Sequence, residues 1–229
     1  MSDRDLDRYE ELARELEDRD DVETSTQSIG TLRETIDSED LRELPPDEIL
    51  ETSGLLSTVL EDGDEIGHVL MVEYDDIDDV MRPIRQAERT PGISVLLRSS
   101  PGSYHVYNLS VRDRDTQLLD AVRKDGDVWQ ARWAVRRGHF VLRILPKRRS
   151  ESREIYKDAP EPVRVFSSES EFPQSSPHLE ILEDLCRRQA IDDVLRDLED
   201  AREGHELIGD GLEVDHYQTV TDESKELVL

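Results

Sequence analysis

Two carboxylates close an apolar segment near the middle of the sequence. Glu73 and Asp75 follow the apolar residues 70–72 and are separated by one residue, Tyr74. In a strand, residues two apart project to the same face, so the pair can converge on one point. Two hard oxygen ligands suit Mg²⁺ or Mn²⁺, with water and substrate phosphates at the other positions. In a chain with 56 acids among 229 residues, the pair also suits solubility or helix capping.

A hydroxyl and an imidazole lie together on a second candidate strand. Ser103 and His105 are also two residues apart, so they share one strand face. The serine can donate a hydrogen bond to a phosphate, and the histidine can contribute charge or a proton. No nucleophile-elbow pattern surrounds Ser103, which disfavours a serine nucleophile. The alternative is a hairpin strand that carries a surface histidine without a function.

A basic segment, residues 131–153, opposes the acidic bias of the chain. It holds eight Arg or Lys residues and one acid, a charge of +7 in a chain whose formal net charge is −27. Trp129, Trp133 and Phe140 are interleaved, and bases stack on such rings beside guanidinium groups. We interpret the segment as a nucleic-acid contact, with pairing to the acidic ends of the chain as the alternative. The predicted contact residues are Arg132, Trp133, Arg136, Arg137, Lys147, Arg148 and Arg149.

Hydrophobic periodicity predicts the scaffold that positions these residues, an α+β core over residues 61–168. Apolar runs and turn signals predict strands at 66–74, 93–98, 103–111 and 139–145. Helical spacing predicts helices at 75–89, 129–137 and 115–124, the last with Leu118, Leu119 and Val122 inward. The order β-α-β-β-α-β is typical of a ferredoxin-like, RNA-recognition-like sheet, with two helices on one face. The other face is then free for a ligand.

The segments outside this core have weaker patterns. Residues 1–20 predict an amphipathic helix, and residues 21–60 a linker with short helices, one of them after Asp47. Residues 169–202 predict one C-terminal helix, and residues 203–229 an acidic, loosely attached tail. The terminal helices are candidates for binding a replication partner protein.

Composition restricts the class of protein. The acids are spread through well-patterned segments, and lysine occurs only at positions 124, 147, 157 and 225. At molar salt the Debye length is about 3 Å, which screens the self-repulsion of such a chain. We therefore expect a halophilic, archaeal source. The single cysteine, Cys186, excludes an intramolecular disulfide and a multi-cysteine zinc site. The sequence contains no signal peptide and no apolar run of membrane-spanning length, so we expect a cytoplasmic protein without a membrane partner.

Together, these motifs resemble the catalytic core of the archaeo-eukaryotic primase superfamily, the primase–polymerases of plasmids, viruses and cellular replication. The apolar run ending in acid-x-acid at 70–75 resembles its first motif, and Ser-x-His at 103–105 resembles its second. The resemblance implies that Glu73 and Asp75 bind divalent metal. It also implies that His105 contacts the phosphates of an incoming nucleoside triphosphate.

The third motif departs from that family, because Arg143 stands where a carboxylate is expected.

Two function hypotheses follow. The first is a divergent primase-polymerase-like DNA replication protein of a halophilic archaeon, or of its plasmid or virus. In it, Ser103, His105 and Arg143 hold the nucleoside triphosphate, and the basic segment holds the template. The second is a non-catalytic nucleic-acid-binding or regulatory protein on the same fold. DNA is favoured over RNA as the partner in both.

Overall fold

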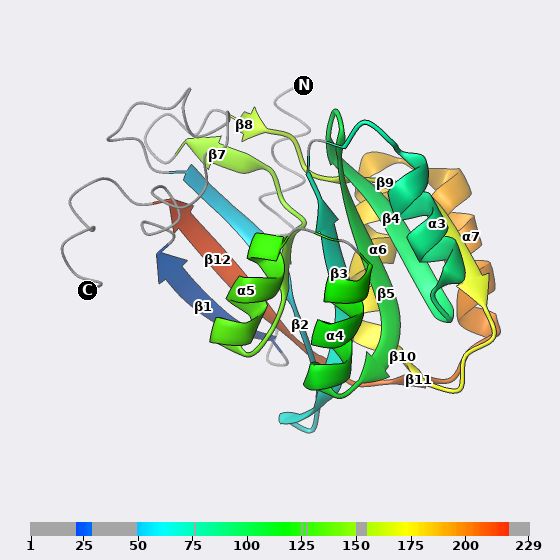
Figure 1. Ribbon diagram of the computed structural model, residues 1–229. Coiled ribbons are helices and arrows are strands. Elements are labelled where there is room, and N and C mark those ends of the chain that lie inside the picture. The colour runs from blue at the N-terminus through cyan, green and yellow to red at the C-terminus, as the bar shows by residue number, and fades with distance from the viewer. Residues whose placement is uncertain are drawn as a thin grey trace.

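Figure 1 shows a computed structural model of the chain, in which helices pack on both faces of a curled sheet. The structure describes residues 22–28, 50–75, 77–124, 126, 128–149 and 155–219. Its class is α+β, as the sequence predicts. The helix predicted at 1–20 lies outside the described residues. Within the described ranges, no helix is both long and apolar enough to cross a membrane.

The described strands belong to one sheet, whose main path is β1-β12-β2-β3-β5-β10-β11, with β4 between β5 and β9. The strands are β1 (Val22–Ser28), β2 (Leu50–Glu61), β3 (Asp64–Tyr74), β4 (Gly92–Ser100), β5 (Ser103–Arg112), β6 (Val141–Arg143), β7 (Lys147–Arg149), β8 (Ile155–Lys157), β9 (Glu161–Ser168), β10 (Gln174–Ser175), β11 (Leu207–Ile208) and β12 (Gly211–Thr219). The helices are α3 (Met81–Arg89), α4 (Arg114–Arg123), α5 (Val128–Arg137), α6 (Ser176–Gln189) and α7 (Asp192–Glu203).

Strands β3, β5 and β4 form the centre of the sheet, at the positions that the sequence predicts. β5 lies between the other two and is antiparallel to both. Their apolar side chains are buried almost without a break, as expected for strands covered on both faces. Register places Glu73 of β3 and Leu97 of β4 directly beside His105 of β5. The two candidate motifs are therefore neighbours across one strand pair.

The sheet opens between β2 and β3. These two strands pair only between residues 58–61 and 64–68, and β6 then pairs with β2 at 54–56. The strand predicted at 139–145 therefore lies beside β2 and is paired with it. Along the opened edge of β3, the backbone N–H of Glu73 donates to Gln130 Oε1 of α5 at 2.9 Å. A helix side chain thus supplies the hydrogen bond that a neighbouring strand would otherwise provide.

Both faces of the central sheet are covered, so the expectation of a free face is wrong. Helices α3, α4 and α5 lie on one face, and α6 and α7 pack on the opposite face (Figure 1). Helix α6 buries Leu179, Leu182 and Leu185 completely, which joins it to the same hydrophobic core as the strands. The single helix predicted over 169–202 is two helices, because Ala190 adopts the left-handed conformation (φ 55°) and ends α6.

The expected linker and tail also contribute strands. β2 forms where we predicted a linker with a helical turn, and residues 55–59 of it are buried. β12 forms within the segment predicted as a loose tail, and it pairs with both β1 and β2. Strand pairing between segments 151 to 190 residues apart leaves no local signal in either segment, which is why periodicity did not reveal it.

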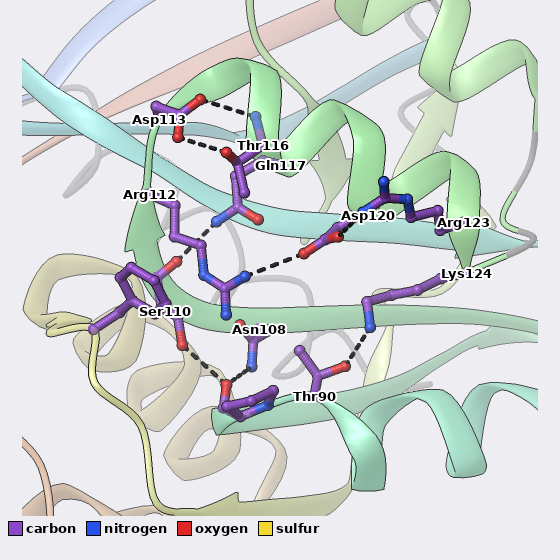
Figure 2. A network of polar contacts seen from close by, with 12 residues as sticks. Thr90, Asn108, Ser110, Arg112, Asp113, Thr116, Gln117, Asp120, Arg123 and Lys124 are labelled. Carbon is purple, nitrogen blue, oxygen red and sulfur yellow. Dashed lines mark hydrogen bonds and ion pairs between the residues drawn. The ribbon is translucent and has the colours of Figure 1, made fainter.

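Helix α4 packs through polar as well as apolar groups. It buries Gln117 and Ala121, whereas Leu119 and Val122 are 56 % and 64 % exposed, contrary to prediction. Gln117 Nε2 donates to the carbonyl of Ser110 at 2.9 Å (Figure 2). It also donates to the carbonyl of His68 at 2.8 Å, so this side of the helix faces inward. The hydrogen bonds, rather than the aliphatic side chains, set the rotation of the helix.

Candidate functional site

The structure brings Glu73 and His105 into contact. His105 Nε2 lies 3.4 Å from Glu73 Oε1 across the β3–β5 pair. The His105 side chain is 2 % exposed and the Glu73 side chain 29 % exposed. Within the described part of the chain, His105 Nδ1 is buried without a hydrogen-bond partner. The pair therefore has an inner imidazole and an outer carboxylate that solvent reaches.

Electrostatics fix the charge state of the pair. Burial lowers the pKa of His105, and Glu73 only partly opposes that shift, while Arg143 and Lys157 reinforce it. Burial favours protonation of Glu73, but the hydrogen bond from His105 and the charges of Lys147 and Lys157 outweigh it and lower the pKa of Glu73. At neutral pH, a neutral imidazole therefore donates Nε2–H to an ionised carboxylate, which leaves Nδ1 as an acceptor.

Three basic side chains from the chain after α5 act on the pair through their charge. Lys147 and Lys157 are register partners across β7 and β8, and both act on Glu73 through their charge. Arg143 is 8 % exposed and donates to the backbone carbonyls of Leu145 and Ser99 at 2.9 and 3.2 Å. It also donates to the carbonyl of Asp158. Arg143 thereby ties β6 to the end of β4 and to the segment after β8.

The other predicted site residues are placed less favourably for metal chemistry. Ser103 is buried at the start of β5, on the same strand face as His105. Asp75 lies just beyond the end of β3 and is exposed. Among the described residues, no group of three His, Cys, Asp or Glu side chains is arranged to hold a metal ion. In the primase pattern, Arg143 stands at the sequence position of a third carboxylate. The predicted binding of Mg²⁺ or Mn²⁺ by Glu73 and Asp75 stays a prediction.

The predicted basic contact residues divide between two locations. Arg132, Trp133 and Arg136 lie on α5, and Arg149 lies on β7, all at positions whose side chains the structure does not describe. Lys147 and Arg148 belong to β7, and of these two Lys147 acts on Glu73 through its charge. The basic segment is continuous in the sequence, but the fold divides it between α5 and β7.

Arg137 lies at the far end of α5 and lines a separate polar pocket of about 370 Å³. Glu65, which also lines that pocket, is eight residues before Glu73 on β3, or roughly 26 Å at the rise of a strand. His139, at the same pocket, has its pKa lowered by burial to about 4. Arg137 is therefore remote from the Glu73–His105 pair.

Sequence reasoning missed two residues of the site, Lys157 and Gln130. Gln130 had no sequence signal, since its role is to bond a backbone group far along the chain. The rarity of lysine marked Lys157 in the sequence, but only the structure shows that it lies opposite Lys147. Lysine is used four times in the sequence, and two of those four, Lys147 and Lys157, face each other across one strand pair beside Glu73. A rare residue type indicates a functional site when the structure brings its few copies close together.

Comparison with known proteins gave no match: no family model, curated protein or solved structure is similar to this chain.

Proposed function

We propose that this protein binds single-stranded nucleic acid at the cationic site formed by Arg143, Lys147 and Lys157 around the Glu73–His105 pair. The observation that carries the proposal is this gathering of basic side chains in a chain of formal net charge −27. Two of the three residues belong to the basic segment. Phosphate contacts of this kind dominate affinity for nucleic acid, and they need no metal ion.

The chemistry of the site supports binding over catalysis. Two-metal phosphoryl transfer requires carboxylates that hold both ions, and Arg143 occupies the place of one of them. Its guanidinium is engaged with three backbone carbonyls, so it holds the scaffold as well as adding charge. Lys147 and Lys157 supply the charge that a phosphate backbone needs, and the Glu73–His105 pair lies beside them.

Salt-dependent binding tests this proposal. Fluorescence anisotropy with a labelled single strand across a KCl series should give a linear fall of log K with log[KCl]. Lys147→Glu should weaken binding and reduce the slope by about one, as expected for a lost phosphate contact. The control is Arg196→Glu on α7, an exposed residue with the same change of charge. Equal effects of the two variants would show that only net charge matters and would refute the site.

The second candidate is a primase-polymerase-like nucleotidyl transferase on a ferredoxin-like core. Contact between Glu73 and His105 favours it, because it joins the first two motifs of that family's pattern. Template-directed incorporation of nucleotides in high KCl, abolished by His105→Ala and by Asp75→Ala, would support it. Binding without incorporation, and unaffected by Asp75→Ala, would select the non-catalytic protein.

A further inference from the structure

The reachable group at the centre of the cationic site is a hydrogen-bond acceptor. Glu73 is 29 % exposed, while His105 and Arg143 beside it are 2 % and 8 % exposed. His105 donates to Oε1, and among the described residues the carboxylate accepts no other hydrogen bond. An ionised carboxylate offers about four acceptor positions, so this partly exposed group keeps acceptor capacity for a ligand.

This acceptor is held in place rather than free to turn away. The backbone N–H of Glu73 is bonded to Gln130, and its side chain is bonded to an imidazole that is itself buried. The neutral imidazole must donate through Nε2, so His105 fixes one oxygen and does not occupy the other. A ligand that reaches Lys147 and Lys157 with its phosphates therefore meets a fixed carboxylate near them.

A nucleic-acid backbone offers a carboxylate very different contacts in DNA and RNA. The sugar–phosphate backbone of DNA contains only acceptors, so Glu73 would repel it and lose hydration without gaining a hydrogen bond. In RNA, every sugar carries a 2′-hydroxyl, which can donate and which is the group that distinguishes RNA from DNA. Lys147 and Lys157 can bind the phosphate of a ribonucleotide, and Glu73 can accept a hydrogen bond from the adjacent 2′-hydroxyl.

We propose that Glu73 accepts a hydrogen bond from a ribose 2′-hydroxyl, so that this site selects single-stranded RNA over DNA of the same sequence. The inference rests on the proposed nucleic-acid binding at the site. It reverses the preference for DNA that the sequence motifs suggested. In this arrangement Lys147 and Lys157 contribute affinity for either polymer, Glu73 contributes discrimination, and His105 is a positioning residue that orients Glu73.

The test compares three oligonucleotides of one sequence on the unaltered protein: RNA, DNA and 2′-O-methyl RNA. RNA gains a hydrogen bond to Glu73, whereas DNA leaves this acceptor unpaired. RNA should therefore bind about 10-fold more tightly than DNA. The 2′-O-methyl strand keeps the RNA sugar but lacks the donor, so it should bind like DNA. Equal binding of RNA and 2′-O-methyl RNA would overturn the role of the hydroxyl.

Two variants assign the discrimination to the residue. Glu73→Ala should reduce the RNA-to-DNA affinity ratio to about one, and Glu73→Gln, which keeps one acceptor oxygen, should retain part of the ratio. Lys147→Glu should weaken both polymers and leave the ratio unchanged. An unchanged ratio in Glu73→Ala overturns the inference but leaves the proposed function standing. If none of the three strands binds, the proposed function itself fails.

Discussion

Replacing Arg143 by methionine tests whether this arginine is a structural clamp. The change keeps an unbranched apolar stem and removes the guanidinium. Two of its acceptors, the carbonyls of Ser99 and Leu145, belong to buried residues, whereas Asp158 is exposed and water can replace the lost bond. Each buried group left unsatisfied costs about 1–3 kcal/mol, so we expect a loss of about 3 kcal/mol in the free energy of unfolding.

Urea unfolding followed by tryptophan fluorescence at fixed KCl measures this loss, and the melting temperature should fall by about 6–12 °C. The control is Arg196→Met, because Arg196 is 64 % exposed and its pair with Asp193 should contribute less than about 1 kcal/mol. A change within about 0.5 kcal/mol of the wild type for Arg143→Met would refute the clamp. Arg143→Asp, which restores the acid of the primase motif, should destabilise further, since it buries a charge beside carbonyl oxygens.

Three further predictions concern the scaffold. Gly92→Ala should lower the free energy of unfolding by about 2–4 kcal/mol, because the φ of Gly92 is +92° and a Cβ would lie 2.3 Å from Ser110 Oγ. The control is Gly63→Ala, at φ +81° in open space, which should cost only about 1 kcal/mol. Equal losses of the two variants in urea unfolding would contradict this packing. Burial lowers the pKa of His178 from 6.5 to about 4, so the unfolded chain takes up a proton first and stability should fall as pH drops from 6.5 to 4. His178→Gln should flatten that fall by at most about 3 kcal/mol, as measured by unfolding across this pH range. Burial raises the pKa of Cys186 to about 12, so it should resist thiol reagents until the protein unfolds; rapid labelling of the native protein would contradict its burial.

The parts of the fold that the sequence predicts are those with local signals. The hairpin of β4 and β5 follows from two apolar runs around Pro101-Gly102, and α4 from helical spacing between residues 115 and 124. The covered sheet face could not be predicted, because an amphipathic pattern in α6 shows that the helix packs but not on what. The rotation of α4 was missed for a similar reason: Gln117 is buried by carbonyls that are distant in sequence.

In the candidate site, too, the features with a local sequence signal were predicted and those that depend on distant contacts were not. Spacing alone predicts that Glu73 and Asp75 share one strand face and that Ser103 and His105 share another. The register adds that Glu73 and His105 are direct neighbours across β3 and β5. The meaning of Arg143 could not be read from its motif position, because its partners are backbone carbonyls from three separate segments. Nor does the sequence reveal that the β7–β8 pair returns Lys157 to the site.

Photo-crosslinking tests the central claim most directly. A single strand carrying a photoreactive base, bound to the unaltered protein in KCl and mapped by mass spectrometry, reports which segments touch nucleic acid. The account predicts crosslinks on β6, β7 and β8 and on the Glu73 end of β3, with loss of signal in Lys147→Glu but not in Arg196→Glu. Crosslinks confined to α6 and α7, or none with a strand that binds, would contradict it.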